Sequence, residues 1–152
     1  AYPQLRATLF DMEEAIAAAK RGEGGPLPGV NFVSGDVFAT AAPAGGDVYL
    51  IRHLLHDYED RDCVRILAKV RAAMQPHGRV LVLEAPLPSD ETPSPGRWLD
   101  LQVMLLCGGR ERTVEEYAGL FEQAGLRLAR TMPTQHPAMT VIEAVAAGNP
   151  RG

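Results

Sequence analysis

The strongest structural signal in this chain is Val48-Tyr-Leu-Ile-Arg-His-Leu-Leu-His-Asp-Tyr58. Its first four residues form an apolar run without polar alternation, which is typical of a strand buried on both faces of a sheet. His56 follows where such a strand has ended, just before a helical pattern. Because open α/β sheets bind ligands at the carboxyl ends of their strands, His56 is a candidate general base.

The rest of the chain alternates between short apolar strands and helical patterns. Strands are expected at 7–10, 30–34, 48–51, 80–83, 126–131 and 140–147, and helices at 12–20, 60–74, 98–106 and 113–124. The helix at 98–106 is apolar on most sides, so we expect it to be buried beside the site. The alternation predicts an α/β sheet with a mostly parallel centre, helices on both faces and an antiparallel pair of closing strands.

Capping residues predict where two of these helices begin. Thr113-Val-Glu-Glu116 is a capping box, and Gly125 supplies a left-handed stop to the helix that it starts. Asp57 precedes the helix at 60–74 and is expected to cap it.

Composition narrows the class of protein. The 152 residues have the usual length of one domain, and 46% hydrophobic with 22% charged residues is typical of a soluble globular protein. A net charge of −4 without a Lys/Arg run argues against nucleic-acid binding, and no apolar run is long enough to cross a membrane. Cys63 and Cys107 are too few for a disulfide framework or a metal cluster, which favours a reducing cytoplasm and no metal.

Glu84 ends an otherwise apolar strand, where a carboxylate without a partner would be costly to bury. A histidine at the end of a neighbouring strand would be a suitable partner, which connects Glu84 with His56. The other histidines have no comparable acidic company in the sequence, and we expect them to be ordinary: His53, His77 and His136.

Two further strands end in acidic residues that allow two interpretations each. Asp11 could accept hydrogen bonds from the ribose of an adenosyl cofactor, or it could cap the helix at 12–20. In Gly35-Asp36-Val37-Phe38, Asp36 could accept the adenine amino group while Val37 or Phe38 covers the ring. Taken alone, Gly-Asp is simply a turn signal.

The ordered set of these motifs resembles the S-adenosylmethionine-dependent O-methyltransferases of the caffeate/isoflavone type, which include many bacterial natural-product enzymes. The resemblance covers nearly the whole chain. It depends on the order and spacing of Asp11, Gly35 to Phe38, Arg52 to Tyr58, Glu84 and Gly108-Gly-Arg-Glu-Arg-Thr113. Tyr58 departs from the family's usual Trp but keeps an aromatic side chain.

The resemblance implies a role for each matched residue. His56 matches the general base, and Glu84 and Glu111 match the acids that orient it. Asp11 matches the ribose ligand, the segment Gly35 to Phe38 the adenine contacts, and Arg52 a basic residue near the cofactor. Asp57 and Met104 fall at or near substrate-lining positions, although Met104 is equally well interpreted as a core methionine.

The resemblance also implies parts that this sequence does not contain. The family has a glycine-rich turn after its first strand and a helical N-terminal domain that forms a dimer. Residues 1–147 are therefore expected to be the C-terminal portion of a catalytic domain, followed by a flexible tail at 148–152. We expect a complementary chain or a preceding N-terminal half, and a homo- or hetero-dimer.

The implied reaction is transfer of a methyl group from S-adenosylmethionine to a hydroxyl, most simply a phenol, of a small aromatic or polyketide-like molecule. One alternative keeps the fold and cofactor but catalyses hydroxylation, decarboxylation or a pericyclic reaction. Another is a non-catalytic subunit of a split methyltransferase. No metal, nucleic acid or membrane partner is expected.

Overall fold

A computed structural model of the chain describes residues 4–136 and 138–148, which belong to two compact units divided between Ala44 and Gly45. The first unit contains β1 (Ala7–Asp11), α1 (Glu13–Lys20) and β2 (Val30–Ser34). β1 and β2 form a parallel pair in which Asp11 lies opposite Ser34. The strands and the helix predicted for this part of the sequence are confirmed.

The second unit is built on a four-stranded sheet in the order β3-β4-β6-β5. β3 (Val48–Arg52) and β4 (Arg79–Glu84) are parallel, whereas β6 (Thr140–Ala146) is antiparallel to both β4 and β5 (Leu126–Pro133). The parallel strands and the antiparallel closing pair were both predicted. Residue 137 of the turn between the closing strands and residues 149–152 of the expected tail lie outside the described residues.

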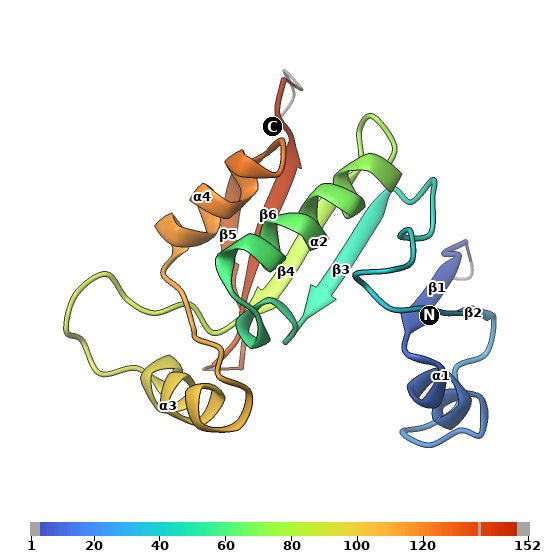
Figure 1. Cartoon of the computed structure of the whole chain (residues 1–152), viewed down its shortest axis with the longest axis horizontal. Coiled ribbons are helices and arrows are strands. Elements are labelled where there is room, and N and C mark those ends of the chain that lie inside the picture. Colours follow the sequence, from blue (N-terminus) through green and yellow to red (C-terminus); the bar gives the residue numbers. More distant parts are fainter. Residues whose placement is uncertain (1–3, 137, 149–152) are drawn as a thin grey trace. The chain divides into compact units, whose positions relative to one another are not determined.

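Two helices of the second unit, α2 (Asp60–Ala73) and α4 (Val114–Gln123), lie side by side over one face of this sheet (Figure 1). Buried side chains come from both layers: Cys63, Ile66, Leu67, Tyr117, Leu120 and Phe121 from the helices, and Val80, Val82, Ile142 and Ala144 from the sheet. The capping box at Thr113 is present, and Gly125 adopts a φ of 76° just after α4, so both ends of this helix were predicted correctly.

The third helix, α3 (Pro95–Cys107), lies next to a short 3-10 helix, η1 (Leu55–Asp57), beyond the carboxyl ends of β3 and β4 (Figure 1). The expectation that it is buried is wrong. Trp98 is 78% exposed and Leu105 is 81% exposed, and Val103 is the buried side chain on its apolar surface. A helix that is apolar on most sides but packs along one side leaves the remaining apolar residues in solvent.

Two other expectations are corrected. Val48 and Leu50 are exposed and alternate along β3 with the less exposed Tyr49 and the buried Ile51, so one face of β3 is open and the strand is not buried on both faces. Asp57 does not cap the next helix, because α2 begins three residues later and the residue at its N-cap is Glu59. None of the described helices is long and apolar enough to cross a membrane.

Candidate active site

The parallel pairing of β3 with β4 brings their carboxyl ends to the same edge of the sheet, since Arg52 lies opposite Leu83. His56 lies in η1 just after β3, and Glu84 is the last residue of β4. Glu111 comes from the segment between α3 and α4. The three side chains meet at this edge although they are far apart in the sequence.

The shortest contact in this group joins His56 Nδ1 to Glu111 Oε1 at 2.7 Å. Glu84 Oε2 lies 3.3 Å from the same ring nitrogen. Both carboxylates are almost completely buried, and His56 is 7% exposed. A proton on Nδ1 is donated to Glu111, which leaves Nε2 as the basic nitrogen, and this nitrogen lies 3.6 Å from Asp57 Oδ1.

Glu84 also fixes the turn that carries His56. Its Oε1 accepts hydrogen bonds from the backbone N–H groups of Leu54 and Leu55, each at 3.1 Å. Its Oε2 has no hydrogen-bond partner among the described residues. Burial raises the pKa of Glu84 to about 7, although the charge of His56 opposes this shift.

The environment of His56 favours its charged form. Burial acts to lower the pKa of the imidazole, but the hydrogen bond to Glu111 and the charges of Glu84 and Glu111 outweigh it and raise the pKa. Two buried acids therefore stabilise a proton on His56, which is the property that a general base needs after it has taken a proton.

A buried arginine also forms hydrogen bonds to the turn that carries His56. Arg112, which is fully buried, donates to the carbonyls of Leu55 at 3.0 Å and Tyr58 at 2.7 Å, on both sides of His56. It also forms an ion pair with Asp60 at 2.7 Å. Arg112 directly follows Glu111. Its hydrogen bonds to the carbonyls of Leu55 and Tyr58 therefore hold the Glu111 segment next to the turn that carries His56. The sequence did not predict this role.

Gly109 explains the glycine in the motif before Glu111. A Cβ added at this position would lie 1.9 Å from the carbonyl oxygen of His56, and Arg110 N–H donates to that carbonyl at 2.9 Å. The two backbone segments can therefore approach this closely only if residue 109 has no side chain.

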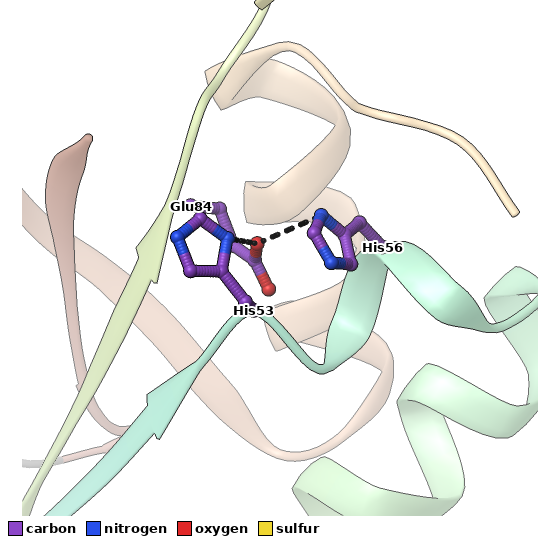
Figure 2. A group of neighbouring side chains, drawn as sticks. All are labelled: His53, His56 and Glu84. Carbon is purple, nitrogen blue, oxygen red and sulfur yellow. Dashed lines mark ion pairs between the residues drawn. The ribbon is translucent and has the colours of Figure 1, made fainter. Parts of the chain in front are cut away.

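His53 was expected to have no acidic neighbour comparable to that of His56, and this expectation is wrong. Its Nδ1 lies 3.6 Å from Glu84 Oε2, and its ring lies 5.3 Å from that of His56. Figure 2 shows the Glu84 carboxylate between the two histidine rings. His53 also has a φ of 46°, which is uncommon for a residue with a Cβ. The sequence offered one indication that His53 lies at the site, which is its position three residues before His56 in the segment that follows β3.

The acidic residues of the first unit are arranged differently. Asp11 is exposed and accepts a hydrogen bond from Met12 N–H at 2.7 Å, but Met12 is the N-cap of α1, so the capping interpretation of Asp11 is not supported. Asp36 is exposed and accepts from Phe38 N–H at 2.6 Å, which forms the turn expected from Gly-Asp. Asp11 is the last residue of β1, and Asp36 lies two residues after the end of β2.

The other predicted site residues lie just after β2, at the end of β3 and on α3. A Cβ on Gly35 would lie 2.7 Å from the ring of Phe10, so this glycine is needed for packing. Val37 is partly buried in the turn after β2, and Arg52 is exposed at the end of β3. Met104 is 54% exposed on α3, which excludes its interpretation as a core methionine in this structure.

Comparison with known proteins identifies the family. A family model described as an O-methyltransferase domain matches residues 1–127, and the chain therefore belongs to this family. Phenazine O-methyltransferase PhzM from Lysobacter antibioticus is 42% identical over 93% of this chain and 42% of its own length. The mitomycin biosynthesis 6-O-methyltransferase of Streptomyces lavendulae is 38% identical over 94% of this chain and 41% of its own length.

The fold agrees with that of a solved O-methyltransferase structure. The O-methyltransferase NcsB1 from neocarzinostatin biosynthesis, determined with S-adenosylmethionine and 2-hydroxy-5-methyl naphthoic acid, superposes with a TM-score of 0.80 and 30% identity. The match covers 95% of this chain and 42% of that one. The predicted α/β methyltransferase fold is confirmed, and the chain spans about two fifths of the length of these relatives.

Proposed function

We propose that this chain provides the base and the acidic residues for methyl transfer from S-adenosylmethionine to a hydroxyl group of a small aromatic molecule. The observation on which this proposal depends most is the buried contact of 2.7 Å between His56 Nδ1 and Glu111 Oε1. A histidine held in this way has a defined tautomer and a free Nε2. That arrangement suits removal of a proton from a substrate.

The chemistry follows from the ionisation of the acceptor. Bound S-adenosylmethionine supplies a methyl group on a positively charged sulfur, and a phenol, with a pKa near 10, attacks that methyl group far better as its phenolate. His56 Nε2 would take the hydroxyl proton as the oxygen attacks the methyl carbon. The new carbon–oxygen bond would form as the sulfur–methyl bond breaks, which would leave a neutral thioether as the leaving group. Glu111 and Glu84 offset the positive charge that develops on the ring, as the acid does in a serine protease triad.

The assignments for the cofactor follow the family resemblance. In the first unit, Asp11 is proposed to accept hydrogen bonds from the ribose hydroxyls, and Asp36 from the adenine amino group. Val37 and Phe38 would cover the adenine ring. Asp11 ends β1 and Asp36 follows β2 by two residues, so both exposed carboxylates come just at or after the carboxyl ends of a parallel strand pair, which supports these assignments. In the second unit, Arg52 is proposed to lie near the cofactor.

The acceptor is proposed to be a hydroxylated aromatic or polyketide-like natural product. PhzM is named as a phenazine O-methyltransferase, the second relative is named for mitomycin biosynthesis, and the NcsB1 structure contains 2-hydroxy-5-methyl naphthoic acid. Asp57 is proposed to contact the substrate because it lies beside the free nitrogen of His56. Met104 is proposed to line the substrate site through the resemblance alone.

A cytoplasmic location and a dimer, with an N-terminal part or partner chain completing the enzyme, belong to the same proposal.

The test is a comparison of His56→Ala with His77→Ala in the native polypeptide that contains this sequence. His77 is exposed and serves as the matched control. Loss of a general base should lower turnover of a phenolic acceptor by about a hundredfold to ten-thousandfold and leave binding of S-adenosylmethionine intact. Unchanged turnover in His56→Ala would reject the assignment. Mass spectrometry should show that the product has gained one methylene unit; loss of carbon dioxide or gain of oxygen would contradict methyl transfer.

A further inference from the structure

Glu84 and a second histidine, His53, approach each other beside the proposed base. Glu84 Oε2 is buried and has no hydrogen-bond partner among the described residues, and it faces His53 Nδ1 at 3.6 Å. The same oxygen lies 3.3 Å from His56 Nδ1. One carboxylate oxygen therefore lies between two imidazole rings, as Figure 2 shows.

These separations are close to those of a tetrahedral metal site. With bond lengths of about 2.1 Å to nitrogen and oxygen, two ligands of a tetrahedral Zn²⁺ lie roughly 3.4 Å apart. The two distances to Glu84 Oε2 are 3.6 Å and 3.3 Å, and one donor atom from each of the three residues lies within 4.8 Å of the others.

We infer that His53, His56 and Glu84 form a binding site for Zn²⁺ or a similar divalent transition metal, and that the metal acts as an inhibitor. Two imidazole nitrogens and one carboxylate oxygen are a donor set that Zn²⁺ accepts, with a fourth position left for water. The His53 side chain is 32% exposed and offers a route from solvent. Mg²⁺ prefers six oxygen ligands and should bind poorly here.

The inhibitory effect rests on the proposed function, because it requires that His56 is the base. A metal on Nδ1 displaces the hydrogen bond to Glu111 and leaves the proton of the neutral ring on Nε2. That nitrogen can then no longer accept a proton from the substrate. Metal binding itself does not depend on the reaction, so it can be tested separately.

The experiment is a calorimetric titration of the full chain with ZnCl₂, repeated with MgCl₂. His53→Ala is the informative variant, and His77→Ala is the matched control because His77 is exposed. We expect one Zn²⁺ per chain, no binding of Mg²⁺, and at least about tenfold weaker Zn²⁺ binding in His53→Ala, since loss of even a supporting group costs a metal site that much. Equal affinities in the two variants, or no Zn²⁺ binding by the wild type, would overturn the inference.

A second measurement identifies the nitrogen that is bound. In ¹⁵N spectra of the histidine rings, Zn²⁺ should shift Nδ1 of His53 and of His56 and leave the ring of His77 unchanged. Shifts confined to other histidines would also overturn the inference. If Zn²⁺ binds in this way but His56→Ala keeps full turnover, the metal site stands and the proposed catalytic role of His56 fails.

Discussion

Two pairs of acidic residues at strand ends and loops of this protein have opposite environments. Glu84 and Glu111 in the second unit are almost completely buried, and both contact His56, which is distant in the sequence. Asp11 and Asp36 in the first unit are exposed, and each accepts a hydrogen bond from a residue one or two positions further along the chain. The family resemblance implies that all four are site residues.

The difference shows how each pair can function. A buried carboxylate must find a partner within the protein, so the fold determines the geometry of Glu84 and Glu111 before any ligand binds. An exposed carboxylate is stabilised by water and can exchange that water for hydroxyl or amino groups of a ligand. We therefore expect substitutions of Glu84 and Glu111 to alter folding and proton transfer. Substitutions of Asp11 and Asp36 are expected to alter the affinity for S-adenosylmethionine. Four predictions test this contrast.

The largest effect is expected from Gly109→Ala, which disturbs the contact between the Glu111 segment and the His56 turn. The added Cβ would lie 1.9 Å from a backbone oxygen, so the backbone must move. We expect a loss of about 3 kcal/mol or more in the free energy of unfolding, the upper range for overpacking. Urea denaturation would measure it.

Gly119→Ala is the control for this experiment. Gly119 lies inside α4 with nothing within 4 Å of an added Cβ, so alanine should stabilise the helix by about 0.5–1 kcal/mol. Similar unfolding curves for the two variants would show that the close approach at Gly109 is unimportant.

The second prediction concerns the pH dependence of turnover. A general base must be deprotonated, and the Glu111 hydrogen bond helps to raise the pKa of His56, so turnover in the wild type should rise with pH through a value above 6.5. Glu111→Gln should move this rise to lower pH and reduce maximal turnover by about tenfold to a hundredfold, because a hydrogen bond to a charged group contributes about 1.5–3 kcal/mol. An unchanged pH profile would show that Glu111 does not influence the proton transfer.

The third prediction concerns stability and pH. The pKa of Glu84 is raised to about 7 in the folded protein. The stability associated with its neutral form is therefore complete below its unfolded pKa of about 4.3 and is lost as pH rises through 7. Glu84→Gln cannot titrate, so the wild type should lose roughly 1–3 kcal/mol relative to this variant between pH 4 and pH 8.

Urea denaturation at several pH values would measure this difference. Glu115→Gln provides a matched control on the exposed side of α4, and its stability should follow that of the wild type at every pH. Parallel curves for the wild type and Glu84→Gln would contradict the buried titration.

The smallest effect on folding is expected in the first unit. Asp11→Asn and Asp36→Asn can keep their local hydrogen bonds, so their free energies of unfolding should stay within about 0.5 kcal/mol of the wild type. If these carboxylates bind the cofactor, affinity for S-adenosylmethionine should fall by about tenfold or more, as expected for loss of a charged hydrogen-bond acceptor. Calorimetric titration with S-adenosylmethionine would measure this. Unchanged affinity would remove both residues from the proposed cofactor site.

Most of the secondary structure was predictable because local rules determine it. The strands are short apolar runs, the helices have regular apolar spacing, and the capping box at Thr113 and the glycine at 125 fix the ends of α4. Local rules also explain why the burial of α3 was predicted incorrectly. An apolar pattern indicates which residues could be buried, but it does not indicate which other segments would cover them. Trp98 and Leu105 remain exposed.

The candidate site was predictable in part. Glu84 could be connected with His56 because a buried acid at a strand end needs a partner, and parallel strands end at one edge. His53 and Arg112 could not be found in this way. The position of His53 beside Glu84 depends on an unusual backbone angle at His53. The role of Arg112 depends on hydrogen bonds to carbonyl groups that are more than fifty residues away in the sequence.

The sequence by itself determined the strands and helices, their order, and the histidine and acids at the ends of the strands. Only the tertiary structure decided that β3 is an edge strand, that α3 is exposed, and that a second histidine lies beside Glu84. The physical reason is the range of the interactions. Propensity, capping and apolar periodicity act over a few residues, whereas burial and side-chain pairing depend on which distant segments pack together.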